Sequence, residues 1–484
     1  MKSVEEAAFA RGITADQLME SAGDAIARST LDFFPNPGHA IVFCGKGHNA
    51  GDVLVAARHL AALGWSFELD LAFPEAELSP LAAQKLAALR SAPQSKIQNP
   101  KSKIVLDGLL GIGSDGSPRE PVASVIRRIQ DWRLQRGAFV VAADIPSGLD
   151  ADTGLPGDPC VVADLTVAIG HAKTGLVADT ATNFVGRLAL ASLPELATDI
   201  GDPSGLITPE TLRSLLPPRP FDSHKGTWGR VGIVAGSRGF LGAARLCSEA
   251  ALRAGAGLVT LYVLPDVYEL LAASVAPEVM VRPVRSYLAV LDDRLDAIGI
   301  GPGLGNEQGV AIRELVTRAT CPMVVDADAL NLLARYPYAW QKMSGPRLFT
   351  PHPLEMARLF RESLDMPRRE AVERYIAKHR ITLLLKGARS LLADREHPIV
   401  YNTTGDPGMG SGGTGDVLTG VCAGFMAEKL SPRNAAMLGA WLCGRAAELC
   451  VFGPGGSPES LTASDIIRHL GAAFRELRGS NFAA

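Results

Sequence analysis

The sequence AIVFCGKGHNAGDVLVAARHLAAL spans residues 40–63 of the chain. Its first five residues, Ala40–Cys44, are apolar and typical of a buried strand. Glycines follow at positions 45, 47 and 51, and the apolar spacing of residues 53–63 then predicts an amphipathic helix. A strand, a glycine-rich loop and a helix in this order form the repeating unit of parallel α/β sheets.

The same alternation continues toward the C-terminus. Strands are predicted at 67–73, 103–107 and 138–144, and helices at 81–90 and 123–136 lie between them. Strands that alternate with helices predict a mostly parallel, doubly wound sheet. We therefore place this part of the chain in the α/β class.

Residues 194–223 separate this region from a second one. The segment is rich in Pro, Gly, Asp and Ser and has no sustained apolar period, which is typical of linkers. We expect a first domain over 1–205 and a second, also α/β, over 206–484. The second has predicted strands at 230–235, 258–264 and 296–300, a helix at 243–254, and closing helices at 413–429, 431–451 and 462–477.

The composition excludes several classes of protein. The 484 residues include 48 Lys and Arg and 51 Asp and Glu, and this balance gives no electrostatic basis for binding nucleic acid or anionic lipid. Hydrophobic residues make up 47%, which excludes intrinsic disorder. The seven cysteines form no CxxC pair, which argues against a zinc site or a disulfide framework. No apolar stretch reaches the roughly 18 residues that span a bilayer, so we expect a cytoplasmic protein without a membrane partner.

Glycine-rich loops at strand ends are the candidate binding segments. The loop GKGHNAGD, residues 45–52, joins a strand to a helix, where backbone N–H groups favour an anion or the polar edge of a nucleotide. No GK[ST] occurs in the chain, which excludes a Walker A phosphate loop. The glycines alone are also consistent with a tight turn.

Two aspartates end predicted strands of the same region. Asp107 and Asp144 each begin a loop of small residues, and ligands of open α/β sheets lie beyond the carboxyl ends of the strands. With Asn49 and Ser147 they offer oxygen ligands of the kind that hold an alkali or alkaline-earth cation. Either aspartate taken singly is equally consistent with a helix cap or a turn.

Four motifs give residues 1–200 a family resemblance. LMESAG (18–23), GKGHNAGDVLVAARHL (45–60), DGLLGIG (107–113) and DIPSGLD (144–150) occur in the order of the NAD(P)H-hydrate epimerase family, which this region resembles and which has a Rossmann-like fold. The resemblance implies a potassium ion on Asn49, Asp107 and Ser147, and Asp144 as a catalytic residue against the reacting carbon. It also implies a substrate cleft formed by His48, Asn49, Ala50, Gly51, Asp52, Gly111, Ile112, Gly113, Ser114, Asp115, Gly116 and Ser117.

One of these motifs departs from the family pattern. The usual NNGGDG appears as HNAGDV, with His48, Ala50 and Val53 in place of Asn, Gly and Gly. Ala50 adds a methyl group where the resemblance implies a close approach of the backbone to the substrate. The departure therefore bears on the rate of epimerisation and not on the fold.

The densest glycine cluster lies in the second half of the chain. GDPGMGSGGTGDVLTG, residues 405–420, opens onto an apolar helix, so Gly413, Thr414 and Gly415 would point backbone N–H groups at an anion. Asp416 follows directly. Because a carboxylate is repelled by a phosphate, Asp416 suits a base for an attacking hydroxyl better than a binding group, although its position also suits a helix cap.

Seven motifs around this cradle occur in order over residues 208–484. They are HKGTWGRVGIVAGS (224–237), GAARLCSEAALRAGAGLVT (242–260), GPGLG (301–305), DADALN (326–331), TPHPLEMARL (350–359), LLLKGA (383–388) and GMGSGGTGDVLTG (408–420). This half of the chain resembles the NAD(P)H-hydrate dehydratase family, which has a ribokinase-like fold.

The second resemblance also implies site residues. Asp416 would be the catalytic base, and Gly413, Thr414 and Gly415 the anion hole. The hydrated nicotinamide would contact Ala243, Gly303, His352 and Asp416, and adenine nucleotide with magnesium would bind Lys386, Gly387, Ala388, Arg389 and Ser390. His352 between two prolines is also consistent with a structural turn, and Asp326 and Asp328 with either magnesium orientation or a helix cap.

Together the resemblances imply a bifunctional enzyme that repairs NADHX and NADPHX, the cofactors hydrated at nicotinamide carbon 6. The first half would interconvert the R and S hydrates. The second would dehydrate the S form at the expense of ADP, which we favour over ATP, and release AMP and phosphate. We expect a homo-oligomer without a nucleic-acid partner. The alternatives are an ordinary small-molecule kinase in the second half and a nucleotide-binding module without turnover in the first.

Overall fold

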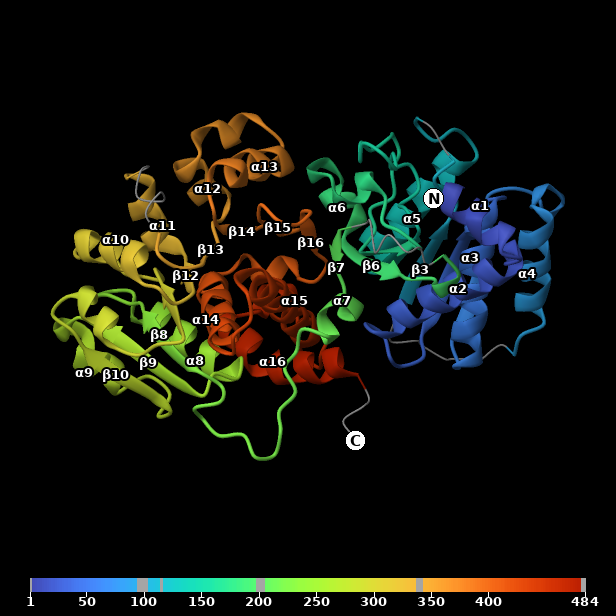
Figure 1. Ribbon diagram of the computed structural model, residues 1–484. Helices are drawn as coiled ribbons and strands as arrows, with labels where there is room; N and C mark the ends of the chain where they lie inside the picture. The colour runs from blue at the N-terminus through green and yellow to red at the C-terminus, as the bar shows by residue number, and fades with distance from the viewer. Residues whose placement is uncertain (1, 94–102, 114–115, 197–204, 337–342, 480–484) are drawn as a thin grey trace. The chain divides into compact units, whose positions relative to one another are not determined.

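The computed structural model describes residues 2–93, 103–113, 116–196, 205–336 and 343–479 (Figure 1). The chain divides into two compact units, Met1–Leu206 and Ile207–Ala484. The first contains a six-stranded sheet, and the second contains most of a ten-stranded sheet whose edge strand spans the division. Both units alternate strands with helices, so the α/β class predicted from the sequence is confirmed.

The sheet of the first unit has the strand order β2-β1-β3-β4-β5-β6, and every neighbouring pair is parallel. The carboxyl ends of all six strands therefore meet at one edge. The strands are β1 (His39–Cys44), β2 (Ser66–Leu71), β3 (Lys103–Gly108), β4 (Phe139–Ala143), β5 (Leu165–Ile169) and β6 (Arg187–Ala191).

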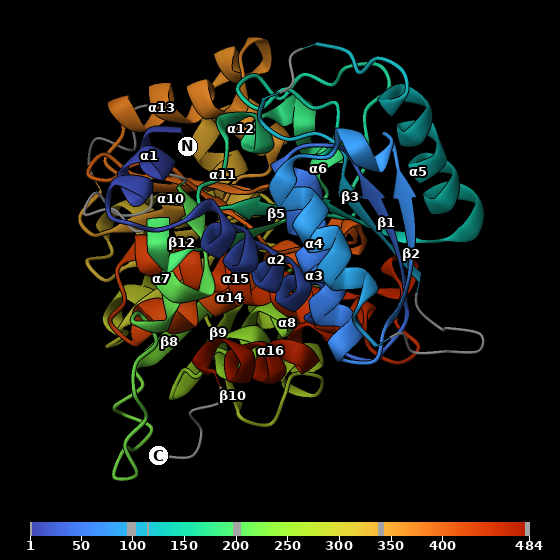
Figure 2. The same ribbon diagram turned by 90° about the vertical axis from the view of Figure 1, so that its right-hand side faces the viewer.

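Helices cover both faces of this sheet. Alternate residues of β1 show this: Ala40, Val42 and Cys44 face one core with α3 and α4, whereas Ile41 and Phe43 face another with α5. Figure 2 shows α5 on one side of β1–β3 and α3 and α4 on the other. The helices are α1 (Lys2–Ala10), α2 (Ala15–Leu31), α3 (His48–Ala62), α4 (Pro80–Arg90), α5 (Val122–Arg136) and α6 (Thr182–Val185), with short 3-10 helices η1 (Glu75–Glu77), η2 (Thr174–Val177), η3 (Asp179–Ala181) and η4 (Pro194–Leu196).

Helix α3 begins earlier than the sequence pattern indicated. It starts at His48, with Gly47 at the N-cap, so the segment expected to be a loop as far as Asp52 forms the first turn of the helix. Asn, Gly and Asp have low helix propensity, which is why the apolar period alone placed the start five residues later. The backbone N–H groups of this first turn point toward the carboxyl edge of the sheet.

The sheet of the second unit is mixed. Its order is β10-β9-β8-β11-β12-β13-β14-β15-β16-β7, parallel from β10 to β14 and antiparallel from β14 to β16. The strands are β7 (Leu206–Ile207), β8 (Arg230–Val234), β9 (Leu258–Val263), β10 (Val279–Pro283), β11 (Ala297–Ile300), β12 (Met323–Val325), β13 (Arg347–Phe349), β14 (Thr382–Leu385), β15 (Leu391–Ala393) and β16 (Val400–Asn402).

Helix α14 is the central helix of this unit. Every residue from Val417 to Ala427 is buried, because the helix packs on β11 and β12 and against α8 and α15. A Cβ atom at Gly420 would lie 2.0 Å from the carbonyl oxygen of Cys247, so only glycine allows α8 to approach this closely. The helices are α7 (Pro209–Arg213), α8 (Leu241–Arg253), α9 (Pro265–Ala272), α10 (Gly309–Arg318), α11 (Ala327–Ala334), α12 (Pro353–Leu359), α13 (Arg368–Lys378), α14 (Thr414–Ala427), α15 (Pro432–Val451) and α16 (Ala463–Arg478), with η5 (Tyr287–Asp292), η7 (Arg361–Asp365), η8 (Pro407–Gly410) and η9 (Pro458–Ser460).

The segment 194–223, predicted as a linker, contains short ordered elements. Besides η4, it holds β7 and α7, whose Thr208 and Thr211 form a capping box. Ile207 and Leu212 are fully buried in the core of the second unit. Two anchoring residues separated by a turn are too few to produce an apolar period, so no pattern in the sequence predicted them.

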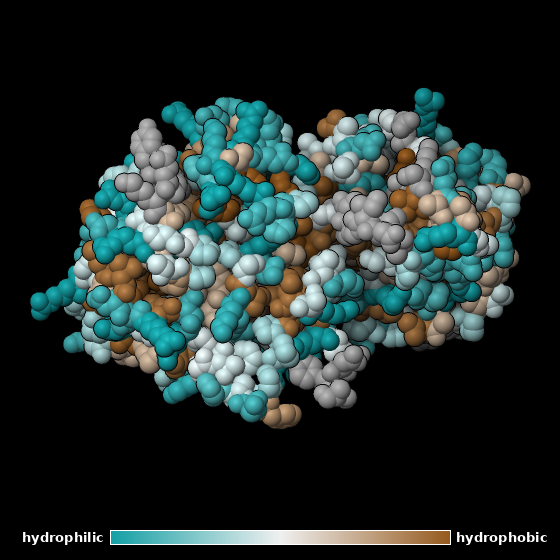
Figure 3. Space-filling model, in the orientation of Figure 1, coloured by the Kyte–Doolittle hydropathy of each residue, from teal (hydrophilic) through white to brown (hydrophobic). Residues whose placement is uncertain are grey.

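The surface has no unusual hydrophobic character in the view of Figure 3, where hydrophobic residues form small groups among hydrophilic ones. No helix in the part of the chain that the structure describes is long and apolar enough to cross a membrane.

Candidate active sites

Neighbouring strand ends bring the polar residues of the first unit together. In the register of the sheet Phe43 pairs with Asp107, and Asp107 pairs with Ala142, two residues before Asp144. The start of α3 and the loops after β3 and β4 therefore leave the same edge of the sheet side by side.

Asp107 is fully buried and surrounded by hydrogen-bond donors. Its Oδ1 accepts from the hydroxyl of Ser147 at 2.7 Å and from the N–H of Leu109 at 3.2 Å, and its Oδ2 accepts from the N–H of Ser147 at 2.9 Å. Burial raises the pKa of Asp107 to about 6 against the effect of these hydrogen bonds. Among the described residues no cationic side chain forms an ion pair with it, so a bound cation would compensate its charge.

Asn49 adds a third oxygen to this cluster. Its Nδ2 donates to the carbonyl of Leu110 at 2.7 Å, and the N–H of Leu110 donates to the hydroxyl of Ser147 at 3.0 Å. The amide is thereby oriented with a buried Oδ1 that accepts no hydrogen bond from any described residue. Amide, carboxylate and hydroxyl oxygens from Asn49, Asp107 and Ser147 are hard donors that fit an alkali cation.

Asp144 lies at the next strand end in an uncommon backbone conformation, with φ of 64°. Its Oδ1 accepts from the N–H of Ile169 at 2.9 Å and from the ammonium group of Lys173, which also donates to the carbonyl of Ile169 at 3.1 Å. Its Oδ2 has no hydrogen-bond partner among the described residues. Lys173 lies outside the motifs recognised in the sequence; the available signal was a lysine among small residues just after a strand (GHAKTG, 170–175).

The predicted substrate cleft of the first unit is only partly exposed. His48, Gly113, Gly116 and Ser117 are exposed, Asp52, Gly111 and Ile112 are half-buried, and Asn49, Ala50 and Gly51 are buried. Ser114 and Asp115 lie outside the described residues. The methyl group of Ala50 is in the hydrophobic core, so the alanine that departs from the family pattern is accommodated by packing.

The LMESAG motif packs helix α2 against the start of α3. A Cβ atom at Gly23 would lie 2.4 Å from Cβ of Val55 and 2.8 Å from the carbonyl oxygen of Asp52, and one at Gly51 would lie 2.2 Å from Sδ of Met19. This close contact fixes the position of the helix whose first turn carries Asn49 and Asp52.

The glycine-rich cradle of the second unit lies at the start of α14. Gly413 is the N-cap with φ of 95°, a conformation that favours glycine. The hydroxyl of Thr414 donates to the carbonyls of Met409 and Ser411 at 3.0 and 3.3 Å, which fixes the loop. The N–H groups of the first turn of a helix have no partner within the helix and can therefore bind an anion; an anion at Gly413, Thr414 and Gly415 stays a prediction.

Asp416 lies in the first turn of α14 and is half-buried, and its carboxylate makes no hydrogen bond to any described residue. It is therefore not a helix cap, which was the alternative interpretation. Burial, followed by the charge of Asp326, raises the pKa of Asp416 to about 6, and Lys386 opposes this shift. A carboxylate with a raised pKa and a free lone pair can accept a proton at neutral pH.

The buried carboxylate of Asp326 and the half-buried ammonium group of Lys386 form an ion pair beside the carboxylate of Asp416. Oδ1 of Asp326 accepts from Nζ of Lys386 at 2.7 Å, and Oδ2 accepts from the hydroxyl of Thr419 at 2.8 Å. Burial opposes the charge of Lys386, but Asp326 and Glu355 outweigh it and raise the pKa of the lysine. Asp326 thus has a partner on each oxygen. It lies at the N-cap position of α11, but its side chain makes no capping hydrogen bond to that helix.

The residues expected at the nicotinamide lie near the same edge of the sheet. A Cβ atom at Gly303 would lie 3.0 Å from Cβ of Ala243, so these two residues are adjacent. His352 caps α12: its Nδ1 accepts from the N–H groups of Leu354 and Glu355 at 3.1 and 3.3 Å. Burial, followed by the charge of Lys386, lowers the pKa of His352, so its ring is neutral at physiological pH.

The predicted nucleotide segment continues from Lys386. Gly387 and Ala388 are exposed, whereas Arg389 is 4% exposed, and burial lowers its pKa to about 10. Ser390 donates to the carbonyl of Gly387 at 3.3 Å. Asp328 accepts from the N–H of Gly305 at 2.9 Å, which ties the DADALN and GPGLG motifs together.

The fold and the sites define an α/β enzyme with a ribokinase-like second unit that carries a glycine-rich cradle and, beside it, the carboxylate of Asp416. Residues 231–469 match the NAD(P)H-hydrate dehydratase family, and residues 15–175 match the family of YjeF-related protein N-termini. A crystal structure of an ADP/ATP-dependent NAD(P)H-hydrate dehydratase from Bacillus subtilis, co-crystallized with ATP and Mg²⁺, is 31% identical in sequence. It covers 56% of this chain and 98% of its own, with a TM-score of 0.51.

Full-length relatives extend the similarity over both units. A bifunctional NAD(P)H-hydrate repair enzyme from Moorella thermoacetica is 36% identical over 95% of this chain and 92% of its own length. One from Coxiella burnetii is 33% identical over 97% of both chains. The chain belongs to the family of bifunctional NAD(P)H-hydrate repair enzymes, with an epimerase and a dehydratase domain.

Proposed function

We propose that this chain restores NADH and NADPH from NADHX and NADPHX in two reactions on separate units. The first unit, around Asn49, Asp107 and Asp144, interconverts the R and S hydrates. The second unit, around Asp416, dehydrates the S hydrate with ADP, or with ATP, as the phosphoryl donor.

Dehydration at Asp416 proceeds by phosphorylation, because hydroxide is a poor leaving group. Asp416 takes the proton of the ring hydroxyl, whose oxygen attacks the terminal phosphoryl group of the nucleotide. AMP leaves when the donor is ADP. Phosphate then leaves with the electrons of the C6–O bond, the ring nitrogen donates electrons to carbon 6, and loss of a proton from carbon 5 restores the dihydropyridine.

The cradle and Lys386 support the charge that develops on the transferred phosphoryl group. Gly413, Thr414 and Gly415 offer backbone N–H groups, and a Cβ atom at Gly415 would lie 3.2 Å from Nζ of Lys386. Magnesium, bound with the nucleotide, supplies further charge neutralisation. Because Asp326 already has partners on both oxygens, we expect the nucleotide phosphates rather than this carboxylate to carry that ion.

Epimerisation requires that a bond to carbon 6 break and form again. We assign this step to Asp144, whose Oδ2 is without a partner among the described residues, with potassium on Asn49, Asp107 and Ser147 ordering the loops beside it. His48, Asp52 and Gly111–Ser117 would bind the rest of the substrate.

The observation that carries the proposal is the carboxylate of Asp416 at the start of α14, which has no hydrogen-bond partner in the described parts of the chain and lies next to the half-buried ammonium group of Lys386. The test is to incubate the chain with the S hydrate of NADH and ADP, or ATP, and to follow recovery of reduced-nicotinamide absorbance. Recovery with nucleotide and none without it is expected. A stable phosphorylated product without recovery would instead identify an ordinary kinase. With the R hydrate, recovery faster than its spontaneous epimerisation tests the first unit.

A further inference from the structure

Lys173 is a buried cation next to the proposed epimerase residue. Its side chain is 7% exposed and that of Asp144 is 14% exposed. The ammonium group lies between the carboxylate of Asp144 and the carbonyl of Ile169, at the end of the neighbouring strand β5. Removing an ammonium group from water costs free energy, so it is buried only where a carboxylate and hydrogen-bond acceptors compensate its charge.

The contacts of Lys173 fix one oxygen of Asp144, whereas the other oxygen has no hydrogen-bond partner among the described residues. Oδ1 accepts from both the ammonium group and the N–H of Ile169. The backbone of Asp144 is also fixed, because its N–H donates to the carbonyl of Val167 at 2.8 Å. Rotation of the carboxylate would break the contacts of Oδ1, so Oδ2 points in one direction.

We propose that Lys173 is a positioning residue for epimerisation: it holds Oδ1 of Asp144, so that Oδ2 alone meets the hydrated nicotinamide. The inference rests on the proposed epimerase function and adds a residue outside the four motifs. Preorganisation of this kind acts on the reacting step more than on binding, and a misplacement of about 1 Å can cost about 100-fold in rate.

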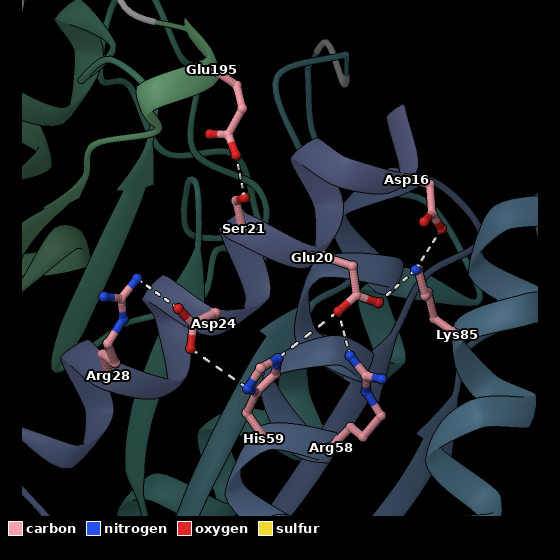
Figure 4. Close-up of polar contacts among 9 residues, drawn as sticks. All are labelled: Asp16, Glu20, Ser21, Asp24, Arg28, Arg58, His59, Lys85 and Glu195. Carbon is pink, nitrogen blue, oxygen red and sulfur yellow. Dashed lines mark hydrogen bonds and ion pairs between the residues drawn. The ribbon is translucent and has the colours of Figure 1, made fainter. Parts of the chain in front are cut away.

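Lys85 offers a matched control in the same unit (Figure 4). It is also a buried, ion-paired lysine, with 5% of its side chain exposed, and it donates to Asp16 at 2.6 Å and to Glu20 at 2.7 Å. Glu20 in turn accepts from Arg58 of α3. Lys85 joins α4 to α2 and contacts none of the residues assigned to the epimerase site, so its loss tests the stability of the unit alone.

The experiment compares Lys173→Met, Lys173→Arg and Lys85→Met in the full chain. Interconversion of the R and S hydrates is followed by chromatography without ADP, so that dehydration does not consume the S form. For Lys173→Met we expect kcat to fall about 100-fold with KM changed less than about 3-fold. Lys173→Arg, which keeps a cation and N–H donors, should recover part of kcat, and Lys85→Met should stay within about 3-fold of the wild-type kcat.

Several results would overturn the inference. They are an undiminished kcat in Lys173→Met, a loss that is confined to KM, a kcat in Lys173→Arg no higher than in Lys173→Met, or an equal loss in Lys85→Met. If Lys173→Met does not keep the wild-type circular dichroism, Lys173→Gln replaces it under the same criteria. A wild-type chain that does not interconvert the hydrates above the spontaneous rate would overturn the proposed epimerase function itself, which separates the two failures.

Discussion

Asp326 and Lys386, which lie 60 residues apart in the sequence, form an ion pair of 2.7 Å at the start of helix α14. Thr419, one turn into that helix, donates to the other oxygen of Asp326. The pair thus joins the ends of strands β12 and β14 to the cradle and places one ammonium group against Gly415, next to Asp416.

Lys386→Met is expected to lower kcat for dehydration by about 100-fold or more, because it removes a fixed positive charge from the site of phosphoryl transfer. Recovery of NADH from the S hydrate measures this. Lys378→Met changes an exposed lysine of α13 and should leave dehydration unchanged. A similar kcat in the two variants would contradict the role of Lys386.

Dehydration should depend on a group that titrates near pH 6. The base must be deprotonated, and the pKa of Asp416 is raised to about 6, so kcat/KM should fall about tenfold per pH unit below that value and level off above it. An ordinary aspartate would retain its activity down to about pH 4. The profile between pH 4.5 and 8 measures the effect, and an undiminished rate at pH 5 would contradict the assignment.

Asp416→Asn keeps the size of the side chain but removes its capacity to accept a proton. We expect dehydration to fall by about 10²–10⁴-fold, and epimerisation to stay at the wild-type rate because Asp144 belongs to the other unit. Separate assays of the R and S hydrates measure both activities. Equal loss of the two would contradict the two-site assignment.

Potassium should both stabilise the first unit and accelerate epimerisation. The buried carboxylate of Asp107 and the buried Oδ1 of Asn49 are its proposed ligands. Thermal unfolding in potassium chloride is expected at a higher midpoint than in tetramethylammonium chloride, and the midpoint should rise with potassium concentration as mass action requires. Identical midpoints and rates in the two salts would contradict a cation site there.

Gly23→Ala tests whether the LMESAG motif positions helix α3. The added methyl group would overlap Val55 and the carbonyl of Asp52, so we expect a loss of about 1–3 kcal/mol in the unfolding free energy of the first unit and slower epimerisation. Denaturant unfolding followed by circular dichroism measures the first effect. Dehydration of the S hydrate is the internal control and should not change.

The sequence predicted the elements that have an apolar run or an apolar period within their own residues. Apolar runs such as Ala40–Cys44 and long helices such as α14 and α15 are visible in the pattern because burial on both faces of a strand, or around most of a helix, leaves few polar residues. Helix α16 is visible because its buried residues recur at the helical period. The strands β12, β13, β15 and β16 have three residues each, too short for a period to emerge. The pairing between strands, including the change from parallel to antiparallel at β14–β16, depends on long-range contacts.

Within the sites, the sequence located single residues but not their partners. Asp107, Asp144 and Asp416 stand out because each follows or begins a recognisable element. Lys173 and the ion pair of Asp326 with Lys386 arise where segments 29 and 60 residues apart in the chain come together, and no local pattern encodes that contact. Likewise, only the structure distinguishes the unpaired carboxylate of Asp416 from a helix cap.

The left-handed backbone at Asp144 limits which residues the position can accept. Asn and Gly adopt this conformation readily, whereas branched or bulky side chains are strained in it. A saturation library at this codon should therefore yield few well-folded products, and Asn should be the one that keeps the shape of the side chain. The asparagine variant is the natural choice for trapping an intact hydrate in crystals. An alanine at this position would both remove the carboxylate and strain the backbone, so the two effects on activity could not be separated.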